Sequence, residues 1–278
     1  MTVYDCFMFS TELKLLEVRL HELDSVVDKF VLVEATRTHT GYPKMLYYEQ
    51  NKDMFKDFQD KIIHVVVDDM PISVEKIAEE LAGKDKTWIE SPWQFDPNWV
   101  RERFQRNAIM RGLVDAQPND IVIISDADEI VRASALRNLV CNFPDNELIA
   151  MNQTLHTYFL NWKCVNMPWP GTKILRYGNI YTPSCDRLHT QPARVVQDGG
   201  WHFGFMGGAD AIRNKIQTYA HQEFNVEAVL GHIEERLVQK KDAIGRLYQY
   251  EVVPIDGSYP EYIQLNLRKF LNWIYIWN

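Results

Sequence analysis

The sequence has few cysteines and no excess of basic residues. Its four cysteines lie far apart and form no C-x-x-C pair, which predicts free thiols in a reducing compartment. The formal net charge of −8 at pH 7 argues against the strongly basic surface that nucleic-acid-binding proteins present. We therefore expect small or neutral partners and no nucleic acid.

Long apolar runs are also absent. No uninterrupted apolar segment approaches the roughly 20 residues of a membrane-spanning helix. The opening residues MTVYDCFMFS enter an apolar stretch with neither a basic n-region nor a small-residue cleavage site, so no signal peptide is visible. These absences predict a cytoplasmic chain without a transmembrane segment.

The sequence does contain enough apolar material for a full core, since 46% of its 278 residues are hydrophobic. In the first half, apolar runs typical of buried strands alternate with segments of helical periodicity. We expect strands over 3–9, 29–35, 61–67 and 121–125, and helices over 11–24, 71–82 and 99–116. This alternation predicts an α/β fold with a mostly parallel sheet and helices on both faces, in a single domain over 1–278.

The strand expected over 121–125 ends in the acidic residues Asp126, Asp128 and Glu129. Asp126 and Asp128 are two apart, so both carboxylates can point to the same side of the chain. Ligands of such sheets bind outside the carboxyl ends of the strands. Paired carboxylates there suit Mg²⁺ or Mn²⁺, which take phosphate oxygens as further ligands and can neutralise a departing nucleoside diphosphate. Helix capping is the alternative interpretation, although a cap needs only one acid.

A strand followed by D-x-D also opens the phosphatases of the haloacid dehalogenase type. Those enzymes place the motif after their first strand and need a later G-D-x-x-x-D-like loop. Here at least three expected strands precede Asp126, and no Gly-Asp dipeptide follows it. The phosphatase interpretation is therefore disfavoured.

Several segments together resemble glycosyltransferase family 17. They are VYDCFMFSTELKLLEVRLHELDSVVDKFVLVEATRTHTGYPK, ERFQRNAIMRGL, SDADEI, GGWHF and HQEF, and the resemblance covers roughly residues 3–225. It implies a GT-A fold, transfer of N-acetylglucosamine from a UDP-sugar to a glycan hydroxyl, a divalent cation and inversion at the anomeric carbon. Residues 1–130 would then bind the nucleotide-sugar and 131–278 would form the acceptor side. Animal members have an N-terminal membrane anchor, and its absence here predicts a bacterial or viral origin.

The resemblance also suggests roles for residues outside the D-x-D motif. Glu34 and Arg37 follow a strand where the sheet would meet the nucleoside, and Arg106 and Asn107 precede the D-x-D strand as a donor-binding pair. His202 is expected to complete the metal site with Asp126 and Asp128, and Asp210 or Glu223 is expected to be the general base. Each has a structural alternative: a helix cap for Glu34, a solvated helix face for Arg106 and a core histidine for His202.

Two other functions remain open. A sugar nucleotidyltransferase would share the core, but that class typically has a Gly-rich, basic loop after its first strand, where this chain has Ser10, Thr11 and Glu12. A catalytically silent carbohydrate-binding protein would retain the aromatic residues but would not need the acidic triplet.

Overall fold

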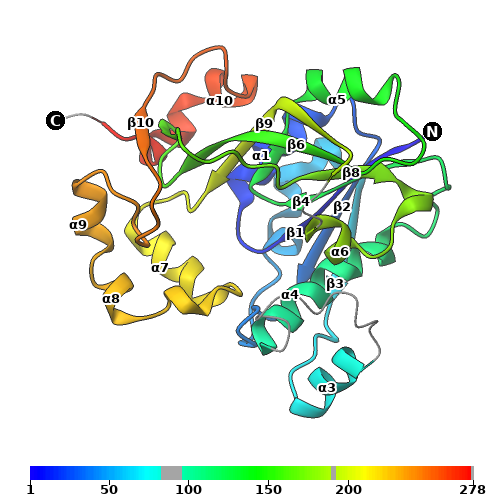
Figure 1. The fold of residues 1–278 in the computed structure, drawn as a ribbon, viewed down its shortest axis with the longest axis horizontal. Coiled ribbons are helices and arrows are strands. Elements are labelled where there is room, and N and C mark those ends of the chain that lie inside the picture. The colour runs from blue at the N-terminus through cyan, green and yellow to red at the C-terminus, as the bar shows by residue number, and fades with distance from the viewer. Residues whose placement is uncertain (83–95, 189–191, 277–278) are drawn as a thin grey trace.

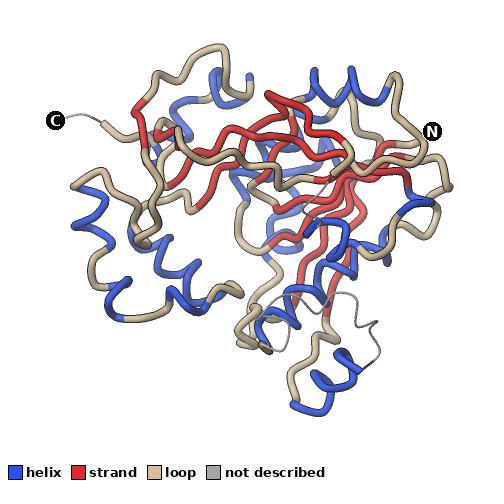
Figure 2. The backbone as a smooth tube through the Cα atoms, viewed as in Figure 1, coloured by secondary structure: helices blue, strands red, loops and turns tan. Residues whose placement is uncertain are grey.

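A long sheet forms the centre of the molecule (Figure 2), in a computed structural model that describes residues 1–82, 96–188 and 192–276. The ten strands of the described ranges join in one sheet. They are β1 (Val3–Phe9), β2 (Lys29–Ala35), β3 (Ile62–Val67), β4 (Ile121–Asp126), β5 (Glu129–Val131), β6 (Ile149–Thr157), β7 (Trp162–Cys164), β8 (Lys173–Arg176), β9 (Arg194–Gly204) and β10 (Tyr250–Val252).

The sheet is parallel only in part. The order is β10-β7-β6-β8-β4-β1-β2-β3, with β9 beside β6 and β5 beside β9. The pairs β1–β2, β1–β4 and β2–β3 are parallel, as expected for the first half, and β6–β9 is parallel too. Strand β8 runs antiparallel to both β4 and β6. The α/β class is confirmed, whereas the expectation of a mostly parallel sheet is corrected to a mixed one, because β5, β7, β8 and β10 pair antiparallel with their neighbours.

Helices cover both faces of the sheet (Figure 1). The α-helices are α1 (Leu13–Leu23), α2 (Tyr47–Asn51), α3 (Val74–Ala82), α4 (Pro97–Asn107), α5 (Ala133–Val140), α6 (Pro183–Leu188), α7 (Ala209–Thr218), α8 (Glu227–Leu230), α9 (Ile233–Val238) and α10 (Glu261–Leu265). The 3₁₀ segments are η1 (Lys52–Phe58), η3 (Ala108–Gly112), η4 (Tyr177–Asn179), η5 (Gln222–Phe224) and η6 (Leu267–Trp273). No helix of the described ranges is long and apolar enough to span a bilayer.

The alternation of side chains along β1 explains why two cores form. Phe7 and Phe9 point to the face that α1 and α5 cover, while Tyr4 and Cys6 point to the face that η3 covers. On this second face, a Cβ at Gly112 would lie 2.4 Å from Cγ1 of Val31, so only glycine permits this approach of η3 to β2.

The helix expected over 99–116 is two pieces in the structure. Asp96 caps α4, since its Oδ1 accepts hydrogen bonds from the backbone N–H groups of Asn98 at 2.7 Å and Trp99 at 3.4 Å. After Asn107 the chain tightens into η3. The end of α4 lies near the end of β4, since Arg106 Nη2 is 2.9 Å from Asp126 Oδ1.

A fully buried ion pair joins α1 to three strands. Arg19 of α1 donates to both carboxylate oxygens of Asp5 in β1, at 2.6 and 2.5 Å. It also donates to Ser125 Oγ at 2.5 Å and to the carbonyl oxygens of Asp126 and Glu129 at 3.0 and 2.9 Å. All five guanidinium N–H groups are thus satisfied, and both ends of the D-x-D turn are attached to the core.

We predict that Arg19→Met lowers the free energy of unfolding by about 3–5 kcal/mol, because it leaves the buried Asp5 carboxylate without a counter-charge. Urea denaturation measures the change. Arg137→Met is the matched control, since Arg137 is exposed and donates to Ser25 Oγ, and we expect a change within about 0.5 kcal/mol. Adding Asp5→Leu to Arg19→Met should restore stability, and a single variant as stable as the control would contradict the role of the pair.

Candidate active site

The Asp126 carboxylate lies between two arginines from different helices. Arg106 of α4 has Nη2 2.9 Å from Oδ1, and Arg187 of α6 has Nη2 3.4 Å from Oδ2. The Asp126 side chain is 35% exposed, while that of Arg106 is 6% exposed. Burial alone would raise the pKa of Asp126, but the two guanidinium groups lower it to about 2, so the carboxylate is charged at neutral pH.

Other carboxylates hold these two arginines in place. Glu102, one turn before Arg106 on α4, accepts from its Nε at 3.1 Å and also from its Nη2. Glu129 is fully buried and accepts from Arg187 Nη2 and, at 2.7 Å, from the indole N–H of Trp169. Both guanidinium groups are therefore fixed before any ligand binds.

Asp128 faces a second group of side chains. Its Oδ2 lies 2.7 Å from Nζ of Lys215 on α7, and its Oδ1 lies 3.6 Å from Nε2 of His202 on β9. The pairing of β5 with β9 sets Glu129 opposite His202 and so brings the imidazole to the turn. Burial would raise the pKa of Asp128, but Lys215 and His202 more than offset it, so the pKa lies well below its usual range.

The spacing of Asp128 and His202 fits two ligands of one cation. Their 3.6 Å separation is too long for a hydrogen bond. It lies within the ~4.2 Å that can separate two ligands each ~2.1 Å from a shared ion. In the described part of the chain, no three His, Cys, Asp or Glu side chains form a ready cluster. Asp128 and His202 alone would hold a cation weakly, so water and phosphate would have to supply its other ligands.

Buried donors without an acceptor lie in the same cluster. Arg106 Nη1 and Arg187 Nε have no hydrogen-bond partner among the described residues. Unpaired buried donors are costly and uncommon. Here they belong to the two side chains that flank a partly exposed carboxylate, so an incoming anion such as phosphate would supply the missing acceptors.

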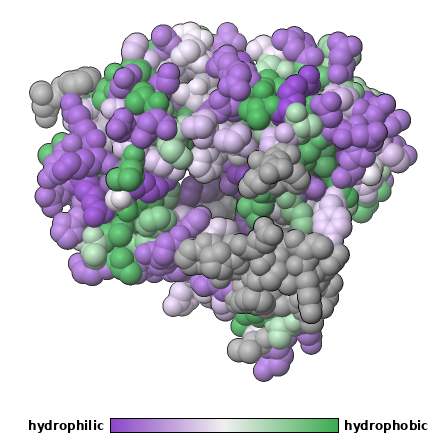
Figure 3. Space-filling model, in the orientation of Figure 1, coloured by the Kyte–Doolittle hydropathy of each residue, from purple (hydrophilic) through white to green (hydrophobic). Residues whose placement is uncertain are grey.

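The structure thus brings Arg106, Asp126, Asp128 and His202 into one connected group. Asn107 adjoins it, but its Oδ1 accepts from the backbone N–H of Ser184 at 3.0 Å and so attaches α4 to the start of α6. In the space-filling view, the surface is hollowed near its centre, between the side that carries α7 to α9 and the side that carries α4 (Figure 3).

Glu34 and Arg37 have their described hydrogen bonds outside this group. In the strand register, Glu34 is opposite Phe9 while Asp126 is opposite Met8, so the two carboxylates point to opposite faces of the sheet. Glu34 is fully buried and accepts from the backbone N–H of Tyr48 at 3.1 Å, as a capping residue does. Arg37 donates within its own loop, to the carbonyl of Gly41 at 3.0 Å.

The two candidate bases lie on the α7–η5 segment that also carries Lys215. Asp210 is fully exposed in the first turn of α7, with Oδ1 3.3 Å from Nη1 of Arg213. Glu223, on η5, has Oε1 2.7 Å from Nδ1 of His221. The structure describes no contact of either carboxylate with Asp126 or Asp128.

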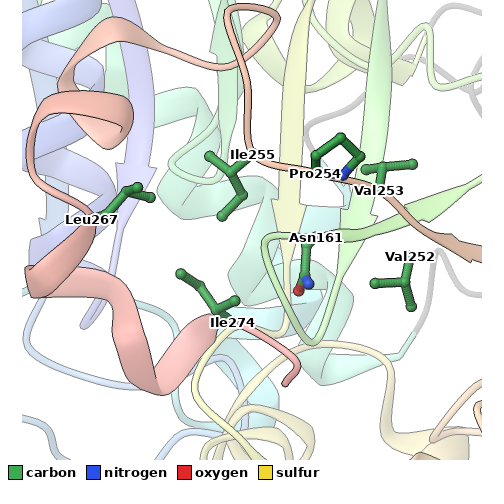
Figure 4. A pocket seen from close by; sticks show the side chains of 7 residues that line it. All are labelled: Asn161, Val252, Val253, Pro254, Ile255, Leu267 and Ile274. Atoms are coloured by element: carbon green, nitrogen blue, oxygen red, sulfur yellow. The ribbon is translucent and has the colours of Figure 1, made fainter. Parts of the chain in front are cut away.

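An open cavity of about 510 Å³ is separate from the charged group (Figure 4). Its lining is mostly aliphatic and comes from the end of β10, from the ends of η6 and from Asn161 before β7: Asn161, Val252, Val253, Pro254, Ile255, Leu267 and Ile274. Because none of the carboxylates described above lines this cavity, we place the site at the Asp126 cluster.

Comparison with known proteins identifies the family. The sequence model of glycosyltransferase family 17 matches residues 1–266 of the chain. The chain belongs to glycosyltransferase family 17.

Relatives of this family 17 chain include the β-1,4-mannosyl-glycoprotein 4-β-N-acetylglucosaminyltransferases of Rattus norvegicus and Homo sapiens. The rat protein is 28% identical over 172 residues, which cover 61% of this chain and 28% of the relative. The human protein is 29% identical over 163 residues, which cover 58% of this chain and 27% of the relative. The matched part of this chain thus spans little more than a quarter of the length of these relatives.

The prediction of a cytoplasmic chain of bacterial or viral origin is wrong. The relatives found are mammalian, from rat, human and mouse. The prediction relied on the missing leader and anchor. The matched part of this chain covers only about a quarter of the length of each relative, so its first residues do not support such a conclusion.

Three basic residues of this family 17 site were not predicted from sequence. Lys215 lies on α7 between the buried residues Ile212 and Ile216, and a lysine beside an apolar helix face was the available signal. Arg19 had a similar signal among the buried leucines of α1. For Arg187, no spacing or motif pointed to the site.

We predict that Gly171→Ala destabilises the packing around Glu129, beside the Asp126 cluster. A Cβ there would lie 2.4 Å from Trp169 Nε1, 2.5 Å from Glu129 Oε1 and 2.9 Å from Arg187 Nη2. Such overpacking should cost about 1–3 kcal/mol, as measured by thermal unfolding followed through tryptophan fluorescence. Gly257→Ala, where nothing lies within 4 Å, is the control. Equal stability of the two variants would refute the tight packing around Glu129.

Proposed function

We propose that this family 17 chain transfers N-acetylglucosamine from UDP-N-acetylglucosamine to a glycan hydroxyl, with a divalent cation and with inversion, on a GT-A type fold. The observation that carries the proposal is the pair of strand-end carboxylates, Asp126 and Asp128, surrounded by three basic side chains and a histidine. The donor sugar rests on the names of the relatives, which are N-acetylglucosaminyltransferases. In this proposal residues 1–130 supply the nucleotide-sugar half and 131–278 the acceptor side, from which Arg187 and His202 reach the diphosphate site.

The residues of the cluster have distinct roles in this proposal. Asp128, His202 and Asp126 would hold Mn²⁺ or Mg²⁺, which when bound neutralises charge on the departing UDP. Arg106 and Arg187 orient Asp126 and offer their unpaired N–H groups to diphosphate oxygens. Because both guanidinium groups are already fixed by Glu102 and Glu129, little reorganisation is needed as charge develops.

The general base is proposed to be Asp210 or Glu223. An inverting transfer needs a group that takes the proton of the acceptor hydroxyl, and a carboxylate is the usual choice. Asp210 is open to solvent and so to an incoming glycan. Glu223 is paired with His221, which would orient its carboxylate.

The loop after β1 argues against the nucleotidyltransferase alternative. Glu12 Oε2 accepts from the backbone N–H groups of Ser10 at 2.9 Å and Thr11 at 2.8 Å. These N–H groups are therefore already hydrogen-bonded to a carboxylate, whereas sugar nucleotidyltransferases use a Gly-rich basic loop to hold the triphosphate.

We predict that Asp128→Ala lowers the rate of sugar transfer at least about a hundredfold, because a lost cation contact is worth several kcal/mol in the transition state. The fold should survive, since Lys215 is 31% exposed and can turn to solvent once its partner is gone. Transfer is measured with UDP-N-acetylglucosamine across a Mn²⁺ titration, beside melting curves. Asp145→Ala, at a site 83% exposed, is the control. Full activity of Asp128→Ala would exclude the assignment.

We further predict a β-linked product. Inversion of the α-linked donor sugar by a single in-line displacement leaves the new bond equatorial, so the anomeric proton should show the large coupling of a β-glycoside. NMR of the purified product measures this coupling. An α-linked product would overturn the inverting mechanism, and preference for another UDP-sugar in competition would overturn the donor assignment.

A further inference from the structure

Lys215 differs from the other basic residues of the site in how firmly it is held. Its side chain is 31% exposed, against 6% for Arg106 and 11% for Arg187. Each arginine is fixed by a second carboxylate outside the D-x-D pair, Glu102 or Glu129. Among the described residues, Asp128 is the one carboxylate within ion-pair distance of Lys215. Among the three, Lys215 is therefore the cation that can leave without breaking another ion pair.

The contact of Lys215 uses the carboxylate that a metal would need. The Asp128 side chain is 7% exposed, so it requires a counter-charge when no metal is bound. The Lys215 ammonium supplies that charge at 2.7 Å from Oδ2. A divalent cation on Asp128 would repel the ammonium and compete for the same lone pairs. The ammonium of Lys215 and a divalent cation therefore cannot occupy the position at Asp128 at the same time.

The chemistry of lysine suits such an exchange. An ammonium on a flexible four-carbon stem can rotate away, whereas each guanidinium group is also held by Glu102 or Glu129. The ring of Phe205 lies 5.1 Å from Nζ and stabilises the cation without neutralising it. An ammonium displaced from Asp128 therefore stays beside the site with its charge available to an anion.

We propose that Lys215 takes the place of the cation in the metal-free protein. Metal binding displaces it from Asp128, and the freed ammonium then pairs with the diphosphate of the donor. Lys215 is thus a positioning residue that keeps the metal site assembled when empty and weakens metal binding until donor is present. The inference rests on the proposed function, since it takes Asp128 as a cation ligand.

The test is calorimetric titration of Mn²⁺ into donor-free protein, with the parent compared to Lys215→Met. Removing the competing ammonium should tighten Mn²⁺ binding by about tenfold. The same variant should melt about 2–8 °C lower without metal, and Mn²⁺ should raise its melting temperature more than that of the parent. If Lys215 had a purely structural role, Lys215→Met would lower the melting temperature without tightening Mn²⁺ binding.

Two further variants make the result decisive. Arg213→Met removes one charge from the same helix, where Arg213 is 30% exposed and pairs with Asp210 and Glu234, and it should leave the Mn²⁺ affinity unchanged. Lys215→Arg retains the charge and should bind Mn²⁺ no more tightly than the parent. If the parent binds Mn²⁺ and Lys215→Met binds it equally or more weakly, displacement is overturned while the proposed function stands. If the parent binds no Mn²⁺ even with UDP, the cation of the proposed function fails, and the inference fails with it.

Discussion

The buried guanidinium of Arg19 is the interaction on which the site depends. It attaches β1 through Asp5, β4 through Ser125 and both ends of the D-x-D turn through two backbone carbonyls. Fixing the backbone of this turn fixes the directions in which Asp126 and Asp128 point. The diphosphate role proposed for this site would gain from such order before the ligand arrives, since the cost of ordering is met during folding.

Charge compensation is the second constraint. Four carboxylates, those of Glu102, Asp126, Asp128 and Glu129, gather where β4 ends, and they would repel one another without partners. Arg106, Arg187 and Lys215 supply those partners from three different helices. Because each basic residue comes from a separate segment, the packing of α4, α6 and α7 against the sheet determines how strongly the turn attracts a metal or an anion.

The first half of the fold could be predicted from sequence because its strands are continuous apolar runs that alternate with periodic helices. The position of Asp126 and Asp128 at a strand end followed from the same pattern. The position of His202 beside Asp128 depends on the β5–β9 pairing, which no local pattern reveals; His202 was predicted as a ligand from its glycine-flanked segment and from resemblance to GT-A enzymes. The mixed second half has weaker periodicity, since β6 and β9 contain polar residues, and β9 also glycines, within their length. Lys215 and Arg187 reach the turn by tertiary packing alone, and Glu34 faces away because of a register that a single strand cannot show.

The central claim is that the strand-end carboxylates hold a nucleoside diphosphate through a divalent cation. Calorimetric titration of UDP into the parent protein, once with excess Mn²⁺ and once with a chelator, tests it most directly. The account predicts clear binding with Mn²⁺ and affinity at least about tenfold weaker with the chelator, since basic side chains alone would remain to hold the phosphates. Equal affinity in both titrations would contradict it.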